Sequence, residues 1–336
     1  MIGHASEKCL EPEETVSMSW EEAFESLSLQ TREQLIRDEP LSKHTTLRVG
    51  GPAEFFVYAK DRDTLAEIAA FSQIHSLPLF LLGDGSNVCV SDAGLRGMTL
   101  RNGCRHAEIG ETSFSETGHN LMRLFMKSLQ AGLSGLEYAV GIPGTVGGAL
   151  VSNAGAYRSN ICDIVRKIEI VESGERRWVD PSWMEFSYRD SRLRRGDGKP
   201  AALLAVTLEL TPAPRPSIRA QARNFQNQRI IKQPWEPSAG SWFKNVLDSE
   251  LADSLPQLTE GMRKSGVVPA GYLTEACGLK GFSIGGAMIA PRHANFIVNR
   301  GNAAAADLRA VANHAKRCVF ERFGVMLEAE VMQIGD

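Results

Sequence analysis

Two glycine-rich runs are the segments of this chain best suited to bind a ligand. One, at residues 141–155, reads GIPGTVGGALVSNAG, and the other, at residues 83–87, reads GDGSN. Glycine lets main-chain N–H groups approach a phosphate or a flat ring, because no Cβ stands in the way. Neither run has the spacing of a P-loop or of a Rossmann domain. A single glycine motif is more often a turn or a helix start, but two in one chain favour a ligand site.

Three other segments carry side chains that could act on a small molecule. Arg189 lies in YRDS, Ser241 in AGSWFKN, and Glu330 in the largely apolar run LEAEV. A guanidinium keeps its charge and can hold a carboxylate through two parallel N–H bonds. A serine can donate a proton only if neighbours, such as Lys244 or water, stabilise its alkoxide. A buried glutamate is rarely tolerated unpaired, so Glu330 is expected to be paired, protonated or functional.

Each of these residues also has a structural interpretation. Arg189 precedes three more arginines within six residues, which alone favours an exposed basic patch, and Ser241 alone would be an ordinary loop serine. Glu328 competes with Glu330, because residues two apart share one face of a strand. Another, mostly cationic, set could bind a diphosphate or simply form a solvated face: Arg229, Lys232, Lys244 and Asn245.

Composition indicates an ordinary globular protein. The 336 residues are 43% hydrophobic and 23% charged, with a net charge of −3. This length accommodates two or three compact units with a sizeable core. The weakly acidic balance indicates neither nucleic acid nor an anionic membrane as a partner, while a local basic pocket is compatible with it.

Cysteine and histidine usage predicts no metal. The six cysteines are scattered, without C-x-x-C, and His44 and His293 have no metal partner at a recognisable spacing, so they are interpreted as structural or substrate-rim residues. No window approaches about eighteen uninterrupted apolar residues, and acids replace the basic start of an export signal. We expect reduced cysteines and a cytoplasmic protein with no membrane span.

The elements that must position these residues follow from hydrophobic periodicity. Residues 1–38 are acidic and are interpreted as an appendage with a short helix at 20–35. A proline-rich break at 211–216 predicts a domain boundary. Beyond residue 38 the pattern predicts strands at 53–59, 78–82, 165–171, 203–210 and 325–334, and helices at 63–76, 118–131, 217–231 and 304–323.

Nine motifs follow one another in register between residues 41 and 335. They are HTTLRVGGPA (44–53), GDGSN (83–87), GIPGTVGGA with NAGAY (141–157), YRDS (188–191), RIIKQP (229–234), AGSWFKN (239–245), AGYLTEACGLKG (270–281), HANF (293–296) and LEAEV (327–331). Together they resemble the UDP-N-acetylenolpyruvoylglucosamine reductase (MurB) family of peptidoglycan synthesis. The short spacing from Tyr188 to Ser241 resembles the subgroup that lacks an extra tyrosine-bearing loop.

The resemblance implies an α+β fold. It consists of a PCMH or vanillyl-alcohol-oxidase-type FAD-binding domain of two α+β subdomains, plus a smaller α+β substrate domain. The expected division is an N-terminal extension (1–38), the FAD-binding domain (39–213, with subdomains at about 39–110 and 111–213), the substrate-binding domain (214–324) and a C-terminal strand returning to the catalytic centre (325–336).

The resemblance also implies noncovalent FAD, NADPH as the hydride source, and reduction of UDP-N-acetylglucosamine enolpyruvate to UDP-N-acetylmuramate, in a protein expected to be a monomer. Ser241 would donate the proton, Arg189 and Glu330 would stabilise the intermediate, and Arg229, Lys232, Lys244 and Asn245 would bind substrate. FAD would contact Gly83, Asp84, Gly85, Ser86, Asn87, Gly141, Ile142, Pro143, Gly144, Thr145, Gly147, Gly148, Asn153, Ala154 and Gly155.

Several positions depart from the family pattern. Val246 stands in place of proline, Arg158 in place of glycine, and Pro291 in place of serine or threonine, and the connection at 246–269 is long. Two alternatives stay open: a flavin-dependent oxidase of the same fold acting on another small molecule, and a non-catalytic nucleotide-sugar-binding descendant. Keeping Arg189, Ser241 and Glu330 together argues against the second.

Overall fold

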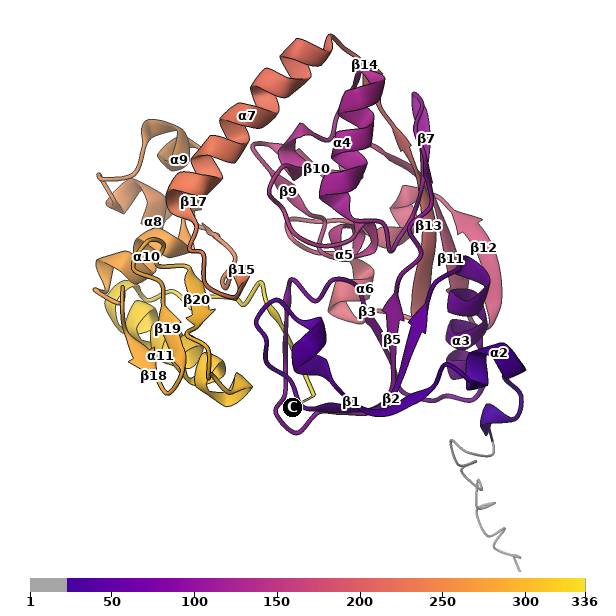
Figure 1. The fold of residues 1–336 in the computed structure, drawn as a ribbon. Helices are drawn as coiled ribbons and strands as arrows, with labels where there is room; N and C mark the ends of the chain where they lie inside the picture. Colours follow the sequence, from indigo (N-terminus) through magenta and orange to yellow (C-terminus); the bar gives the residue numbers. More distant parts are fainter. Residues whose placement is uncertain (1–22, 336) are drawn as a thin grey trace, which may run out of the picture.

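The computed structural model describes residues 23–335 and arranges them in three α+β units (Figure 1). Two units lie together on one side, and the third, drawn in orange and yellow, lies on the other. Each unit is built around its own sheet, and a cluster of buried apolar side chains lies mainly within each of them. The mixture of helices and strands agrees with the expected α+β class.

The first unit contains the expected strand–helix–strand segment. Strands β2 (Pro52–Ala59) and β3 (Leu79–Leu82) both run parallel to β5 (Leu95–Asn102), which lies between them. Helix α3 (Arg62–Ile74) connects β2 to β3, and its start is fixed by Asp61, whose side chain accepts a hydrogen bond from the N–H of Thr64. The predicted strand and helix are both confirmed here.

The expected N-terminal appendage is wrong for residues 23–38. The side chains of Ala23, Phe24 and Leu27 are buried in the core of the first unit, and β1 (Ile36–Pro40) pairs antiparallel with β2. The single helix expected at 20–35 is also wrong where it can be compared, because helical residues 23–24 are followed by a turn and then by the separate short α2 (Leu29–Arg32). The beginning of the expected helix lies outside the described residues. Burial of apolar side chains against the sheet outweighed the helical periodicity.

The second unit is a five-stranded antiparallel sheet. Helix α4 (Leu121–Ala131) begins three residues later than expected, because Asn120 caps it by accepting from the N–H of Arg123. In order, the strands are β12 (Glu175–Val179), β11 (Val165–Glu172), β13 (Ala201–Glu209), β7 (Thr112–Glu116) and β6 (Ala107–Glu108). Short elements complete it: β8 (Leu133–Ser134), η2 (Glu137–Ala139), α5 (Val146–Val151), β9 (Gly155–Ala156), β10 (Ser159–Asn160), η3 (Ile161–Asp163), η4 (Pro181–Met184), α6 (Arg192–Arg195) and β14 (Thr211–Pro212).

Helix α7 (Arg215–Lys232) runs from the second unit toward the third (Figure 1). It follows the proline-rich break, as expected. Its buried residues Ile218 and Ala222 belong to the core of the second unit, however. The N-terminal half of α7 is therefore packed with the preceding unit, and the separate core of the third unit begins beyond it.

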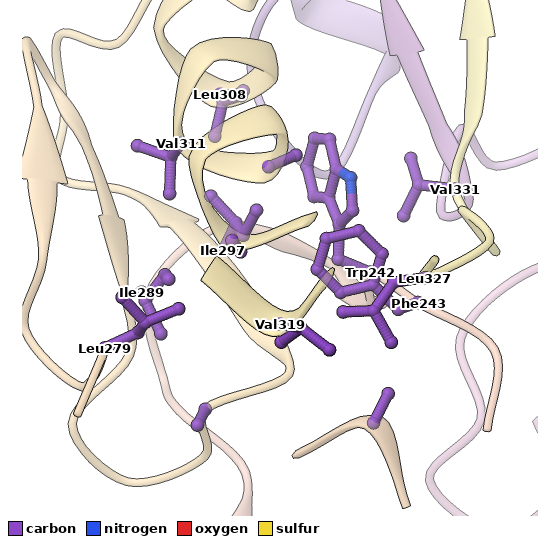
Figure 2. Packing of buried hydrophobic residues seen from close by; sticks show 14 of the residues in the cluster. Trp242, Phe243, Leu279, Ile289, Ile297, Leu308, Val311, Val319, Leu327 and Val331 are labelled. Carbon is purple, nitrogen blue, oxygen red and sulfur yellow. The ribbon is translucent and has the colours of Figure 1, made fainter. Parts of the chain in front are cut away.

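The third unit packs a four-stranded sheet against the long helix α11 (Ala305–Phe323). Figure 2 shows Trp242 and Phe243 among side chains of α11 and the C-terminal segment, such as Leu308 and Val331. The strand order is β15 (Ser238–Ser241), β20 (Phe296–Asn299), β19 (Ala287–Ile289) and β18 (Ser283–Ile284), and α10 (Ala270–Ala276) lies beside α11.

The long connection at 246–269 folds back on itself. Strands β16 (Val246–Leu247) and β17 (Val267–Val268) pair antiparallel and enclose α8 (Ser249–Ser254) and α9 (Glu260–Lys264). Its buried Ala252, Leu258 and Val268 join the core of the third unit. The segment is thus an integral part of that unit.

The C-terminal segment returns to the first unit. Strand β21 (Met332–Ile334) runs parallel to β4 (Val88–Val90), directly after the GDGSN loop. The strand expected at 325–334 is wrong except for these last residues, since only an isolated bridge from Phe243 to Ala329 precedes it. Strand periodicity therefore does not apply to Glu328 and Glu330: the Glu328 side chain is 70% exposed and that of Glu330 only 22%.

Candidate active site

The two glycine-rich loops, 58 residues apart from Gly83 to Gly141 in the sequence, contact each other in the structure. Ser86 Oγ donates to the carbonyl oxygen of Pro143 at 3.1 Å. A Cβ on Gly83 would lie 2.5 Å from Thr145 Oγ1, and one on Gly144 would lie 2.7 Å from Ser86 Oγ. Only glycine at these positions allows so close an approach of the loops.

The contact region of residues 83–87 with residues 141–145, called the glycine junction below, contains a set of unused main-chain N–H donors. Within residues 23–335, the N–H groups of Asp84, Gly85, Ser86 and Asn87 donate to no other atom, and neither do those of Gly144 and Thr145. Main-chain N–H groups grouped at a turn attract anions. The donor set therefore fits an anionic group such as a pyrophosphate.

Thr46, which the sequence interpretation did not single out, connects this junction to the third unit. Its N–H donates to Gly85 O at 3.0 Å, and its hydroxyl donates to Ser238 O at 2.7 Å. Ser238 begins β15, the strand that ends at Ser241. The signal that could have identified Thr46 is its place in the HTTLRVGGPA motif.

Arg189 and Glu330 are brought together, as the resemblance implied. Arg189 Nε lies 3.3 Å from Glu330 Oε1, and both side chains are mostly buried. The two Nη groups donate to the main-chain carbonyls of Asn153 and Gly155. In this structure both Nη groups of Arg189 are therefore already hydrogen-bonded to the main chain and are not free to bind a substrate carboxylate in parallel. Only Nε faces a carboxylate, that of Glu330.

The segment of Ser241 is hydrogen-bonded to the segment of Glu330. The N–H of Glu330 donates to the carbonyl of Trp242 at 2.8 Å, one residue beyond Ser241. Gly240 has φ +79°, and a Cβ there would meet no atom within 4 Å, so the main chain before Ser241 borders open space. Lys244, expected as a neighbour able to stabilise the alkoxide, instead pairs with Glu328 Oε1 at 2.5 Å.

Opposing effects act on the pKa of the Glu330 carboxyl group. Burial raises its pKa, because it disfavours the charged form, while Arg189, Arg194 and Lys244 act in the lowering direction. The net direction is upward. A carboxyl group with a raised pKa beside a cation is typical of functional sites.

The residues expected to bind substrate differ in their burial and in their hydrogen-bond partners. Arg229 is half-buried, and its Nε is buried and unpaired among the described residues. Its guanidinium lies over the ring of Tyr157, and a Cβ on Gly141 would lie 3.0 Å from its Cδ. Burial lowers the pKa of Arg229, and nearby Arg189 adds to this effect. Lys232 is exposed, whereas Asn245 Oδ1 accepts from the N–H of Ala270 and so holds the start of α10.

Main-chain strain is concentrated around the site. Of the nine non-glycine residues with positive φ in the described chain, Asn153, Tyr157, Arg158 and Arg189 all belong to the segments just described. Arg158 has φ +66°, which explains why glycine is usual at this position. Tyr157 is held by stacking on Phe225 of α7, with ring centroids 3.8 Å apart. Such conformations persist where the surroundings enforce them.

In the second glycine-rich run, residues 147–155 make packing contacts and hydrogen bonds with neighbouring segments of the protein. A Cβ on Gly147 would lie 3.1 Å from Thr117 Cβ, so its small size serves packing in α5. Asn153 Nδ2 donates to Ser187 O at 2.8 Å, and a Cβ on Gly155 would collide with Asn160. Ile142 packs against the core of the second unit, as does Ala154.

The histidines and cysteines of the described chain take no part in a metal site. His44 lies between Glu39 and Arg101 and stacks on Phe56, whereas His293 is largely buried. Within residues 23–335 no group of three His, Cys, Asp or Glu side chains could hold a metal ion, and no disulfide joins two cysteines of this range. No helix among these residues combines the length and apolar character needed to cross a bilayer.

Comparison with known proteins agrees with this geometry. A family model described as "FAD binding domain" matches residues 53–179, and one described as "UDP-N-acetylenolpyruvoylglucosamine reductase, C-terminal domain" matches residues 232–334. The fold and the paired glycine loops define the class of FAD-binding oxidoreductases.

Similar proteins identify the family. The UDP-N-acetylenolpyruvoylglucosamine reductase of Halalkalibacterium halodurans is 38% identical over 322 residues, 94% of this chain and 99% of that protein. That of Bacillus subtilis is 36% identical over 307 residues, 90% and 94% of the two chains. The crystal structure of the Thermus caldophilus enzyme superposes with a TM-score of 0.71 at 31% identity, covering 88% of this chain and 98% of that one. The chain belongs to the UDP-N-acetylenolpyruvoylglucosamine reductase (MurB) family, and the expected fold class is confirmed.

A prediction follows for the glycine junction. Gly85 has φ +63°, and a Cβ there would lie 2.0 Å from His44 O, so Gly85→Ala must displace the loop that carries the unused donors. We expect the purified variant to lose most of its FAD, measured as the ratio of flavin to protein absorbance.

Gly261 provides the control. It lies in α9 of the third unit, outside the residues expected to contact FAD, and a Cβ there would meet no atom within 4 Å. Gly261→Ala should retain FAD. Equal FAD content in the two variants would contradict the role assigned to the junction.

Proposed function

We propose that this protein reduces the enolpyruvyl ether of UDP-N-acetylglucosamine enolpyruvate to UDP-N-acetylmuramate, with FAD and NADPH, in peptidoglycan synthesis. The observation that carries the proposal is the 3.3 Å contact between Arg189 Nε and Glu330 Oε1, beside the segment of Ser241, in a chain of this family. The names of the relatives and the FAD-binding match support it.

Reduction of the double bond requires a hydride at one carbon and a proton at the other. The chemistry supplied by bound FAD is the transfer of a hydride from NADPH to the substrate. Negative charge then builds on the substrate carboxylate. We propose that Arg189, with its permanent charge, and Glu330, as a neutral acid that donates a hydrogen bond, stabilise this charge.

Ser241 is the proposed proton donor. Its segment is fixed on both sides, by pairing of β15 with β20 and by the bond from the Glu330 N–H to Trp242 O. A fixed donor needs no reorganisation during the reaction, which favours general acid catalysis. Since Lys244 pairs with Glu328, a bound water is the candidate for stabilising the alkoxide.

Arg229 is the proposed first contact of the substrate diphosphate. Its buried Nε lacks an acceptor among the described residues, and a buried unsatisfied donor costs about 1–3 kcal/mol, which an anionic ligand would recover. Lys232, Lys244 and Asn245 complete the proposed binding set. The junction of residues 83–87 with 141–145 would hold the FAD pyrophosphate.

Other expectations are kept as proposals. FAD is bound noncovalently, since neither glycine loop contains His or Cys, and the protein acts as a cytoplasmic monomer. The substrate-binding region comprises residues 214–324, with α7 shared between units. A flavin-dependent oxidase of the same fold is the alternative; it would be favoured by reoxidation of the flavin by oxygen alone.

The central test uses the purified holoenzyme without oxygen. We expect a yellow protein that bleaches with NADPH and recovers its colour when UDP-N-acetylglucosamine enolpyruvate is added, with UDP-N-acetylmuramate as the product. Trichloroacetic acid should release all flavin to the supernatant. If the reduced flavin is not reoxidised by this substrate but is reoxidised when oxygen is then admitted, the proposal is rejected in favour of the oxidase.

Replacement of Ser241 by alanine should separate the two half-reactions. Bleaching by NADPH needs no proton from Ser241 and should stay close to the wild-type rate, whereas recovery with the enolpyruvyl substrate should slow by at least about a hundredfold, as expected for a lost general acid. Stopped-flow absorbance measures both steps. Equal slowing of both would indicate a structural role for Ser241.

Replacement of Glu330 by glutamine keeps the size of the side chain and a hydrogen-bond donor. Since the neutral acid is the proposed active form, wild-type recovery should decline as the pH rises through the raised pKa of Glu330, and Glu330→Gln should lack this decline. At the optimum the variant should lose transition-state stabilisation of about 3 kcal/mol, with FAD content and melting temperature retained.

The structural alternative for Glu330 gives the opposite result. If the residue served only as the partner of Arg189, the variant would be destabilised by roughly 3 kcal/mol, as for a broken buried pair, and each folded molecule would stay active. Melting temperature and recovery rate, measured on one preparation, distinguish the two.

A further inference from the structure

Arg194 reaches from the second unit to the main chain of the proposed catalytic glutamate. It lies in α6, three residues after Ser191, whose hydroxyl accepts from the Arg194 N–H and so fixes the helix start. Its side chain is 9% exposed. Arg194 Nη2 donates to Glu330 O at 2.7 Å and to Ala329 O at 3.3 Å.

The main-chain carbonyl of Glu330 is held by side chains of two other segments. The segment around Glu330 is not a strand, so ladder hydrogen bonds do not fix it, and the carbonyl of Glu330 instead accepts from Arg194 and from Asn87 Nδ2 at 3.1 Å. The N–H of the same residue is bonded to Trp242 O. Glu330 is thereby held on both sides of its Cα, which fixes the direction in which its side chain leaves the main chain.

The charges around Glu330 come from several elements. Arg189 lies against the carboxylate, Arg194 against the carbonyl, and Lys244 approaches from the loop after β15. Two acids lie in the next layer: Glu328 pairs with Lys244, and Asp190 lies 3.9 Å from Arg194 Nε. The ion pair of Arg194 with Asp190 is long, and the charge of Arg194 still acts on Glu330, where it lowers the pKa of the carboxyl group.

We propose that Arg194 is a positioning residue for Glu330, which fixes its main chain and adds a positive charge beside its carboxyl group. Arg194 contacts main-chain atoms and Asp190, and its Nη1 is buried without a hydrogen-bond partner among the described residues. None of these contacts is with the carboxyl group of Glu330, so Arg194 acts on that group through the main chain and through its charge. This inference rests on the proposed function, because it assumes that Glu330 acts in the reduction of the enolpyruvyl substrate.

The test measures the pH dependence of flavin recovery with UDP-N-acetylglucosamine enolpyruvate for the wild type, Arg194→Gln and Arg194→Lys. Loss of the positive charge makes ionisation of Glu330 harder, so the alkaline decline should move to higher pH in Arg194→Gln. The rate at the optimum should fall by at least about tenfold, because Glu330 is less well placed. Lysine keeps the charge, so the decline should return to its wild-type position, with the rate only partly restored.

Arg195 offers a matched control. It is the next residue of α6 and is also an arginine, but its side chain pairs with Glu185, Asp190 and Asp197 and has no contact with residues 329–330. Arg195→Gln should leave the alkaline decline and the rate unchanged. FAD content and bleaching by NADPH should be the same in all variants.

Three results would overturn the inference: an alkaline decline that stays at its wild-type position in Arg194→Gln, an equal shift in Arg195→Gln, or a wild-type rate in Arg194→Lys. If Arg194→Gln fails to fold, Arg194→Lys decides, since the inference requires its rate to fall. Failure of the wild-type enzyme itself to recover its colour with this substrate would instead reject the proposed function, and the inference with it.

Discussion

The structure depends on the burial of one carboxyl group beside one guanidinium. Glu330 is far from Arg189 in sequence, and their contact requires that the C-terminal segment cross from the third unit to the second. A buried carboxylate without a partner costs several kcal/mol, so the contact is maintained only if the surrounding segments are fixed. They are fixed by main-chain hydrogen bonds: Trp242, Asn87 and Arg194 each bond to the main chain of Glu330. Strand β21 then continues beside β4 and completes the connection.

The glycine junction applies a different constraint to the same region. There the two loops approach so closely that side chains at Gly83 and Gly144 would collide, and this close packing leaves a row of N–H groups without acceptors. Free main-chain donors are unfavourable unless water or a ligand accepts them, so the junction is adapted to an anion. Thr46 joins the junction to β15, and Asn87 joins it to Glu330. The two glycine-rich loops and the proposed catalytic residues therefore share one hydrogen-bonded framework.

The third unit is held to the others by apolar packing as well as by polar contacts. Its core includes Leu47, Val49 and Cys89, which belong to the first unit, together with the fully buried Trp242 (Figure 2). Since Trp242 directly follows Ser241, the position of the proposed proton donor is determined by a close-packed core, which tolerates little displacement. Helix α7 adds a second connection, because its first half packs on the second unit while its last turn carries Arg229 and Lys232. The proposed catalytic residues, at the junction of three units, are thus supported by packing from each of them.

The sequence by itself determined the local elements and the family. The strand at 53–59, the helices of α3 and α11, and the glycine loops follow from periodicity and motif, because these signals lie within a few neighbouring residues. Tertiary structure alone decided the rest. The core of the first unit took up residues 23–38, a short bridge replaced most of the strand at 325–334, and Glu330 became buried while Glu328 pairs with Lys244 at the surface. The tertiary structure also placed Thr46 and Arg194 in hydrogen bonds at the site, and it bonded the Nη groups of Arg189 to main-chain carbonyls. These outcomes depend on which distant segments meet, and burial and hydrogen bonding between such segments leave no mark on the local pattern of a sequence.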